Sequence, residues 1–401
     1  MKEREIAYQN LCSVIIDRKF SNLVLRNSRE TSPFITQLVY GTLRNYRLVR
    51  EAWSRYAERK LPERIAILLD TACYELLLLD KPQYATVNEW VTVAGRIKSG
   101  AYKGVVNAIL HRVSSDDLNT GDLAIATSHP DWLVRMWQAH YGEETAEQIC
   151  RADIREPRVA LRANELLTSR DELLKDSRFT AGKLESALYY DGNVIQSEYY
   201  ENDLVIIQSE SSQEVVNNLP IREGMQILDV CAAPGSKSLQ MAMKMNNTGR
   251  VVANDLYDFR AELISRNAVR YGLKNVEVCC HDGTQIDQFY PAGSFDIVLL
   301  DGACSGLGTL RHKPEIKIFI TDKDIDDLVQ LQRRLLEAAA LMVAPGGILM
   351  YSTCTLNKKE NERQVEGFLK DHPHFRLQKQ RTVLPMDYDS DGFYWARMAR
   401  E

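Results

Sequence analysis

The stretch Leu228-Asp-Val-Cys-Ala-Ala-Pro-Gly-Ser-Lys237 decides the fold of the C-terminal half of the chain. It begins within a short apolar run over 225–230 and precedes a helix-like segment that starts near Ser238, so it lies at a strand-to-helix turn. Small residues let the backbone approach a ligand closely, and the N-terminus of the next helix offers unpaired N–H groups. We therefore expect a ligand-binding loop. Its pattern is not G-x-G-x-x-G, which argues against a dinucleotide-binding loop or a P-loop.

The surrounding sequence alternates between strand-like and helix-like segments from 206 to 401. Such alternation predicts a Rossmann-like α/β domain, whose mostly parallel sheet is covered by helices on both faces. Ligands bind such sheets at the carboxyl ends of their strands. The expected strands are 225–230, 250–255, 276–282, 295–301 and 347–354, and the expected helices are 238–245, 260–272, 324–343 and 360–372.

The N-terminal part of the chain has a different character. Residues 1–125 show apolar positions recurring at intervals of three and four, which predicts an all-α domain. Residues 126–205 combine a helix over 132–153 with strand-like pieces at 158–164 and 187–196, which predicts a small α+β connector. With 206–401 as the third domain, 401 residues of which 45% are apolar suit a multidomain chain.

Composition restricts the function classes further. The charged N-terminus and the absence of an apolar run of about 18 residues favour a cytoplasmic protein without a membrane span. Eight cysteines occur without a C-x-x-C pair, so neither a zinc site nor a disulfide framework is indicated and we expect no metal. The net charge of −5 means that any RNA-binding surface would have to be local.

Acidic residues follow the second and third predicted strands. Asp255 lies about twenty residues after the glycine loop, where an acid can accept hydrogen bonds from a ribose diol. Asp282 ends the next strand and could accept from an adenine amino group, and Lys237 could add a cation. Each acid alone is more often a helix cap or a turn residue. Together with the small-residue loop they favour an adenosyl ligand.

Two cysteines follow the fourth and fifth strands, in Asp301-Gly-Ala-Cys304-Ser-Gly and Ser352-Thr-Cys354-Thr. A single buried cysteine is usually inert packing, but two at one sheet edge suggest covalent catalysis by a thiolate. The residues alone do not rank the two thiols. Lys237, Arg311, His312 and Lys313 are candidate cations for stabilising a thiolate.

Over nearly its whole length the sequence resembles the Sun/RsmB family of ribosomal RNA 5-methylcytosine methyltransferases. The N-terminal segments 40–44, 86–89 and 106–110 resemble the NusB-like RNA-binding domain of that family, and 128–133 resembles its continuation. In the C-terminal half the resemblance is carried by 208–213, 228–237, 301–308, 313–317, 351–355 and Glu360-Asn361.

The resemblance implies a seven-stranded class I methyltransferase domain, S-adenosylmethionine as cofactor, and methylation of C5 of a cytosine in small-subunit (16S) ribosomal RNA by a monomer. It implies Cys354 as the nucleophile that adds to C6 of the base, Cys304 as the thiol that assists release, and Asp301 as a contact to the base. The cofactor contacts that we expect are Cys231, Ala232, Ala233, Gly235, Lys237, Asp255, Arg260, Asp282 and Asp301.

The chain departs from the family pattern before the earlier cysteine, where Gly302-Ala303 replaces Ala-Pro. A proline ring fixes its own backbone torsion and restricts the preceding residue. Its absence leaves the backbone before Cys304 less restricted, so the placement of Cys304 depends on other contacts.

Two alternatives stay open at the level of sequence. A methyltransferase acting on an amino group is disfavoured, because no Asn-Pro-Pro-Tyr or Asp-Pro-Pro-Tyr segment follows the fourth strand. An RNA-binding platform with a decayed catalytic half is the other alternative, given the altered Gly302-Ala303. The RNA contacts that we expect are Arg311, His312, Lys313 and Lys317 after Cys304, and Arg44, Arg47, Arg50, Lys98, Lys103 and Arg112 on the helical domain.

Overall fold

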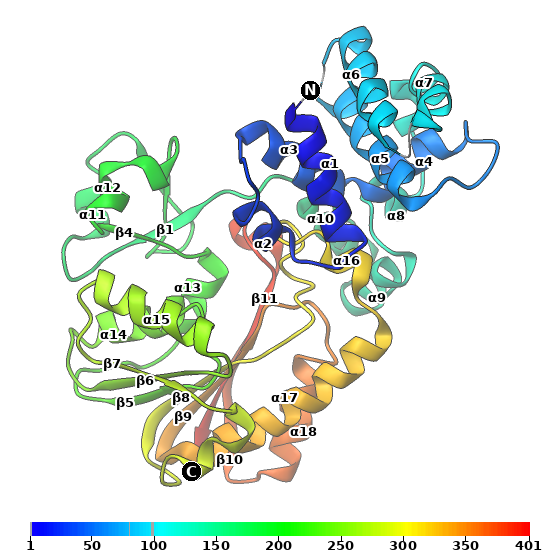
Figure 1. Ribbon diagram of the computed structural model, residues 1–401. Helices are drawn as coiled ribbons and strands as arrows, with labels where there is room; N and C mark the ends of the chain where they lie inside the picture. The colour runs from blue at the N-terminus through cyan, green and yellow to red at the C-terminus, as the bar shows by residue number, and fades with distance from the viewer. Residues whose placement is uncertain (1, 80, 98–99) are drawn as a thin grey trace. The chain divides into compact units, whose positions relative to one another are not determined.

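The computed structural model describes residues 2–79, 81–97 and 100–401 (Figure 1). By its internal contacts the chain divides into two compact units. The first comprises residues 1–156 together with 309–320, and we call it the helical unit. The second comprises 157–308 and 321–401, and we call it the sheet unit. Residues 126–156, which the sequence analysis assigned to the connector, belong to the helical unit.

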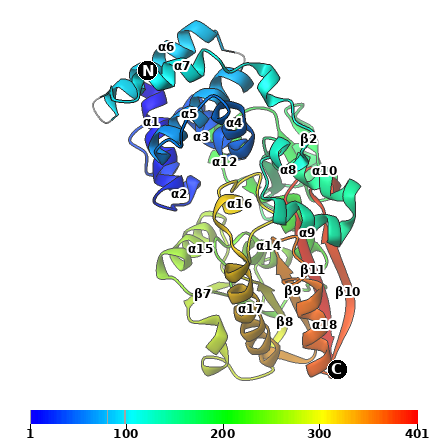
Figure 2. The same cartoon turned by 90° about the vertical axis from the view of Figure 1, so that its right-hand side faces the viewer.

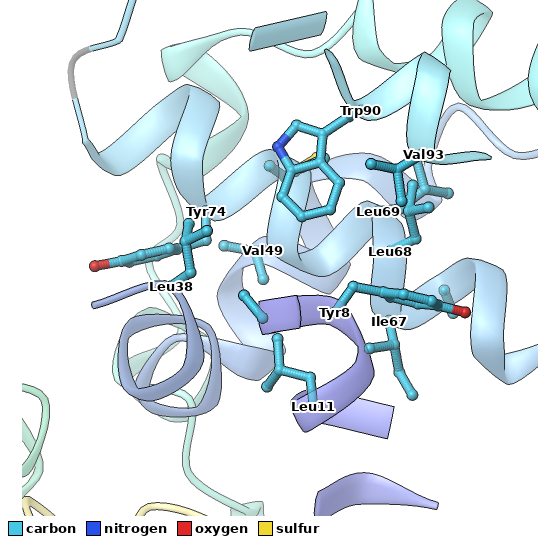
Figure 3. Close-up of a cluster of buried hydrophobic side chains, with 14 of the residues drawn as sticks. Tyr8, Leu11, Leu38, Val49, Ile67, Leu68, Leu69, Tyr74, Trp90 and Val93 are labelled. Carbon is cyan, nitrogen blue, oxygen red and sulfur yellow. The ribbon is translucent and has the colours of Figure 1, made fainter. Parts of the chain in front are cut away.

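The helical unit confirms the predicted all-α character of the N-terminal part. Helix α5 is its centre: most of its side chains are buried, and Ile67, Leu68 and Leu69 pack in the same cluster as Trp90 and Leu11 (Figure 3). The elements of the helical unit are α1 (Lys2–Ile15), α2 (Ser21–Arg26), α3 (Pro33–Arg44), α4 (Tyr46–Ser54), α5 (Glu63–Leu78), α6 (Gln83–Arg96), α7 (Lys103–Leu110), η2 (Ser115–Leu118), α8 (Leu123–Ala126), α9 (Asp131–Tyr141), α10 (Glu143–Asp153) and α16 (Ile316–Phe319).

The single helix predicted over 132–153 is two helices. Gly142 separates α9 from α10 and has a φ of 86°, a left-handed conformation that ends the first helix. The sequence pattern misses this break because apolar residues continue at helical spacing on both sides of the glycine.

The segment 309–320 leaves the sheet unit after Gly308 and is buried in the helical unit. The backbone N and the Oγ of Ser21 donate to the carboxylate of Glu315 at 3.0 and 2.9 Å. The ammonium of Lys317 donates to the carbonyls of Arg44 and Thr127 at 2.9 and 3.3 Å. This short segment is therefore an integral part of the helical fold.

These contacts correct part of the predicted RNA surface. Arg44, Arg311 and Lys317 are 7%, 2% and 3% exposed and donate to backbone carbonyls, so they are structural residues. Arg47 pairs with Asp131, and Arg50 pairs with the buried Asp70. Of the other predicted contacts, Lys103, Arg112, His312 and Lys313 are exposed, and Lys98 lies outside the described residues.

The sheet unit begins with a small antiparallel sheet of order β2-β3-β1-β4, which confirms the α+β nature of the connector. Leu161 and Leu188 are fully buried on it. The elements of this part are β1 (Ala160–Ala163), α11 (Arg170–Leu173), β2 (Phe179–Ala181), β3 (Leu188–Tyr190), η3 (Val194–Gln196), α12 (Glu198–Glu201) and β4 (Val205–Ile207).

The large sheet has seven strands in the order β10-β11-β9-β8-β5-β6-β7. Neighbours from β9 to β7 are parallel, and β11 runs antiparallel between β9 and β10, which confirms a mostly parallel sheet. The strands are β5 (Gln226–Asp229), β6 (Arg250–Asp255), β7 (Val276–Cys280), β8 (Phe295–Asp301), β9 (Val343–Thr353), β10 (Phe375–Val383) and β11 (Phe393–Arg400).

Helices cover both faces of this sheet, as predicted (Figures 1 and 2). Because successive strand residues point to opposite faces, Ile227 packs with α14 whereas Leu228 packs with α17. One face carries α13 (Glu210–Asn217), α14 (Ser236–Lys244) and α15 (Asp258–Arg270), and the other carries α17 (Asp322–Met342) and α18 (Glu362–Asp371). Two short elements, η4 (Gly283–Gln288) and α19 (Pro385–Tyr388), complete the unit. No helix in the described residues is long and apolar enough to span a membrane.

Candidate active site

The predicted ligand-binding loop connects β5 to α14. Gly235 precedes α14 with a φ of 103°, and a Cβ there would approach Ile264 Cγ2 to 3.1 Å. The backbone N of Gly235 donates to the carbonyl of Ala232 at 2.7 Å, and the N of Ala232 donates to that of Asn254 at 2.7 Å. The tight turn therefore requires glycine at 235 and holds the loop against the end of β6.

Asp255 ties this loop to β6. Its side chain is 3% exposed, and Oδ2 accepts from the backbone N of Ala233 at 3.2 Å. Arg260 lies 3.3 Å from the same oxygen and donates to the carbonyl of Ala233 at 3.1 Å. Asp282, after β7, is exposed and accepts from the backbone N and Oγ1 of Thr284, which makes it the cap of η4.

Asp229, at the end of β5, is a candidate that the sequence analysis did not single out. Ser238 Oγ donates to its Oδ2 at 2.6 Å, and the backbone N–H of Cys231 also faces the carboxylate. Its Oδ1 is buried and makes no hydrogen bond of normal geometry with the described residues. Burial raises the pKa of Asp229 to about 7. A buried acceptor oxygen without a hydrogen bond of normal geometry fits a ligand with a hydrogen-bond donor, such as the amino group of an amino-acid moiety.

Cys231, in the same loop, is a candidate cofactor contact rather than a nucleophile. Burial raises its pKa, and the negative charges of Asp229 and Asp255 raise it further. Cys231 therefore stays a neutral thiol at physiological pH.

Asp301 links the ligand-binding loop to the loops that carry the two thiols. Lys237, which is 6% exposed, donates to Oδ2 of Asp301 at 2.6 Å. Ser352 Oγ donates to Oδ1 at 2.7 Å. Both carboxylate oxygens are thus oriented, and the structure joins α14, the end of β8 and β9 at one edge of the sheet.

The two cysteines lie side by side at that edge, with Cys304 Sγ 3.4 Å from Cys354 Sγ. The backbone N of Gly308 donates to the carbonyl of Cys354 at 2.9 Å, and the hydroxyls of Ser305 and Thr355 are 2.8 Å apart. The loops after β8 and β9 therefore run beside each other and present their thiols as a pair.

The environment of Cys304 affects the protonation of its thiol. The hydrogen bond with Cys354 raises the pKa of Cys304 well above its ordinary value, and burial raises it further. Both influences favour the neutral thiol form of Cys304.

The cations suggested from sequence belong to different units of the chain. Lys237 is bound to Asp301. Arg311, His312 and Lys313 belong to the helical unit, where the guanidinium of Arg311 donates to the carbonyl of Glu156.

The backbone before Cys304 is held without a proline. The N of Gly302 donates to the carbonyl of Ser352 at 2.9 Å, and the carbonyl of Ala303 accepts from Gln332 Nε2 at 2.9 Å. These two hydrogen bonds fix the residues that replace Ala-Pro, on one side to β9 and on the other to α17.

A seven-stranded, mostly parallel sheet with a small-residue loop after β5, acids at successive strand ends and two thiols at the same edge defines a Rossmann-like methyltransferase. Family models agree along the chain: "16S rRNA methyltransferase RsmB/F" matches 216–399, "NusB family" matches 1–115, and the ferredoxin-like domain of RsmF/B-like methyltransferases matches 129–181. The chain belongs to the RsmB/F family of 16S rRNA methyltransferases.

Individual relatives match nearly end to end. The chain is 30% identical to the probable ribosomal RNA small subunit methyltransferase B of Bacillus subtilis (strain 168), over 99% of this chain and 98% of the relative. It is 32% identical to the protein of that name from Synechocystis sp., over 92% and 91%. The crystal structure of PH0851 covers 98% of both chains with a TM-score of 0.80 at 22% identity, which supports the fold.

Proposed function

We propose that this member of the family methylates C5 of a cytosine in 16S ribosomal RNA through a covalent bond between Cys354 and C6 of the base. The observation that carries this proposal is the pair of thiols 3.4 Å apart. A methyl transfer to nitrogen or oxygen needs no thiol, whereas C5 of cytosine becomes nucleophilic when a thiolate adds to C6.

S-adenosylmethionine, when bound, supplies an electrophilic methyl group on a sulfonium. The polar groups of the chain fit the functional groups of this cofactor. Asp255 and Asp282 suit the ribose and the adenine, and the N–H groups at the start of α14 suit the carboxylate. The unsatisfied Oδ1 of Asp229 suits the amino group. Cys231, Ala232, Ala233, Gly235, Lys237 and Arg260 complete the proposed contacts.

The residues of the chain then have separate roles. The Cys354 thiolate forms a bond to C6, and Asp301, held by Lys237 and Ser352, orients the base. After methyl transfer, the Cys304 thiol releases its proton to solvent and the resulting thiolate takes the proton from C5, while the electrons of that C–H bond restore the ring double bond as the C6–S bond breaks. Cys354 leaves as a thiolate, which returns the protein to its starting state.

The experiment compares unmodified protein, Cys354→Ala and Cys304→Ala with tritiated-methyl S-adenosylmethionine and unmethylated small-subunit ribosomal RNA. We expect Cys354→Ala to abolish both methyl transfer and the denaturant-resistant protein–RNA adduct. Cys304→Ala should accumulate the adduct, because its release needs a base.

Cys150→Ala, which removes a buried thiol of the helical unit, is the matched control and should retain both signals. Methyl transfer by Cys354→Ala would show that the nucleophile assignment is wrong. If unmodified protein transferred no methyl group to any RNA and bound no cofactor, the RNA-binding platform would be the better account.

A further inference from the structure

A buried carboxylate in the loop after β9 accepts hydrogen bonds from the residue that follows each cysteine. Glu360, in the turn between β9 and α18, is 0% exposed. Its Oε1 accepts from the backbone N of Ser305 at 2.8 Å and from Gln332 Nε2 at 3.1 Å. Its Oε2 accepts from Ser305 Oγ at 2.6 Å, Asn357 Nδ2 at 3.1 Å and Thr355 Oγ1 at 3.4 Å.

Two of these donors are the sequence neighbours of the two cysteines. Ser305 directly follows Cys304, and Thr355 directly follows Cys354. A buried carboxylate is costly unless its oxygens are satisfied, and here the satisfying donors come from both cysteine loops. The same carboxylate therefore fixes the residue next to each thiol.

Neighbouring groups hold Glu360 and the two loops in place. Tyr351 donates through its hydroxyl to the Glu360 carbonyl at 2.6 Å. Asn361 Nδ2 donates to the carbonyl of Thr355 at 2.8 Å, and Gln332, on α17, binds the carbonyl of Ala303 as well as Glu360. The network thus reaches both loops through backbone as well as side-chain atoms.

We infer that Glu360 is a positioning residue that sets the separation of the Cys304 and Cys354 thiols, and with it the balance between adduct formation and release. The geometric part of this inference stands on the hydrogen bonds above, and the kinetic part rests on the proposed function. If Cys304 were displaced, Cys354 could still add to C6 of the base. The proton at C5 would be removed more slowly, so the covalent adduct would accumulate.

The pattern of donors requires a carboxylate rather than an amide. The backbone N–H of Ser305 and the side-chain N–H of Gln332 donate to Oε1 of Glu360. The side-chain N–H of Asn357 donates to Oε2. Whichever way the amide of a Glu360→Gln variant turns, its NH2 group faces an N–H donor. The exchange Glu360→Gln with Asn357→Asp supplies an acceptor at 357 for that NH2 group and should restore the pairing.

The first readout uses protein without RNA. Dibromobimane bridges thiols that lie close together, and peptide mapping identifies the Cys304–Cys354 product. We expect Glu360→Gln to slow this bridging about tenfold, the factor for one unmatched buried hydrogen bond. The double exchange should recover most of the rate.

The second readout is the ratio of trapped RNA adduct to released methylated RNA, which should rise about tenfold in Glu360→Gln. Glu214→Gln is the matched control, because Glu214 is 3% exposed and accepts from Trp395 Nε1 at 3.0 Å. Loss of its carboxylate should lower stability without changing either readout.

Wild-type bridging and adduct ratios in Glu360→Gln would overturn the inference. If circular dichroism showed that this variant does not fold, Ser305→Ala would replace it, because it removes one donor and keeps the carboxylate. Unchanged bridging in Ser305→Ala would also overturn the inference. A failure of the proposed function is distinguishable, because unmodified protein would then form no adduct while the bridging test would still report on thiol geometry.

Discussion

Two glycines flank Cys304 in the same loop, and the structure predicts effects of different size when a methyl group is added to each. A Cβ on Gly302 would lie 3.7 Å from the nearest atom, Tyr351 Cε2, an ordinary contact. A Cβ on Gly308 would lie 2.0 Å from the carbonyl oxygen of Gly392 and 2.9 Å from that of Cys354. We expect Gly302→Ala to change the free energy of unfolding by less than ~1 kcal/mol, and Gly308→Ala to lower it by about 1–3 kcal/mol.

Urea unfolding and methyl-transfer assays of both variants check this prediction. Gly302→Ala should keep wild-type activity, whereas Gly308→Ala should lose activity because the Cys354 backbone must shift. Equal effects of the two substitutions would show that the loops are not held together as described.

At the same scale, the sequence indicates which residues gather at the sheet edge but not what each of them binds. Cys304, Cys354 and Asp301 were expected at this edge because each follows a buried strand. Glu360 was recognised only as part of a motif, since its donors come from segments up to 55 residues away. Arg311 was predicted as an RNA contact from its charge, but charge does not reveal burial.

At the level of elements, α17 carries Gln332 toward the cysteine loops, so the start of this helix influences the site. Thr321 Oγ1 accepts from the backbone N of Asp324, and Asp324 Oδ2 accepts from the N of Thr321 at 2.9 Å, a capping box. We expect Thr321→Ala to lower the free energy of unfolding by about 1 kcal/mol, because one helical N–H group loses its acceptor. Thermal unfolding checks this, with Thr321→Ser as the control that should stay near wild type. A loss in the serine variant as large as in the alanine variant would rule out the cap.

Element prediction succeeded where an apolar run is buried on both faces and bounded by turns. The strands 250–255 and 295–301 have the bounds expected from sequence. The strands β10 and β11 were not located, although seven strands were expected from the family resemblance. Strand β10 is a polar edge strand with exposed Arg376 and Lys379, and the place of β11 between β9 and β10 depends on contacts between distant segments.

At the scale of the whole molecule, the assignment of 309–320 to the helical unit could not be predicted, because a segment within one predicted domain packs in another.

The same segment brings a charged group to a buried histidine. His129 is fully buried, 3.4 Å from Asp153, and Arg47 donates to its carbonyl. Burial lowers the pKa of His129 well below its ordinary value, and the positive charge of Lys317 lowers it further.

This environment predicts a loss of stability in mild acid. The folded protein keeps His129 neutral, whereas the unfolded chain binds a proton below a pH of about 6.5. The contribution of His129 is therefore complete above that pH and is lost as the pH falls, by up to about 1.4 kcal/mol per pH unit. Thermal midpoints measured between pH 7.5 and 5.5 should fall more steeply for unmodified protein than for His129→Gln. Replacing the exposed His111 by Gln is the control and should leave the pH dependence of the thermal midpoint unchanged. If unmodified protein and His129→Gln gave parallel curves of thermal midpoint against pH, His129 would bind a proton in the folded state, paired with Asp153.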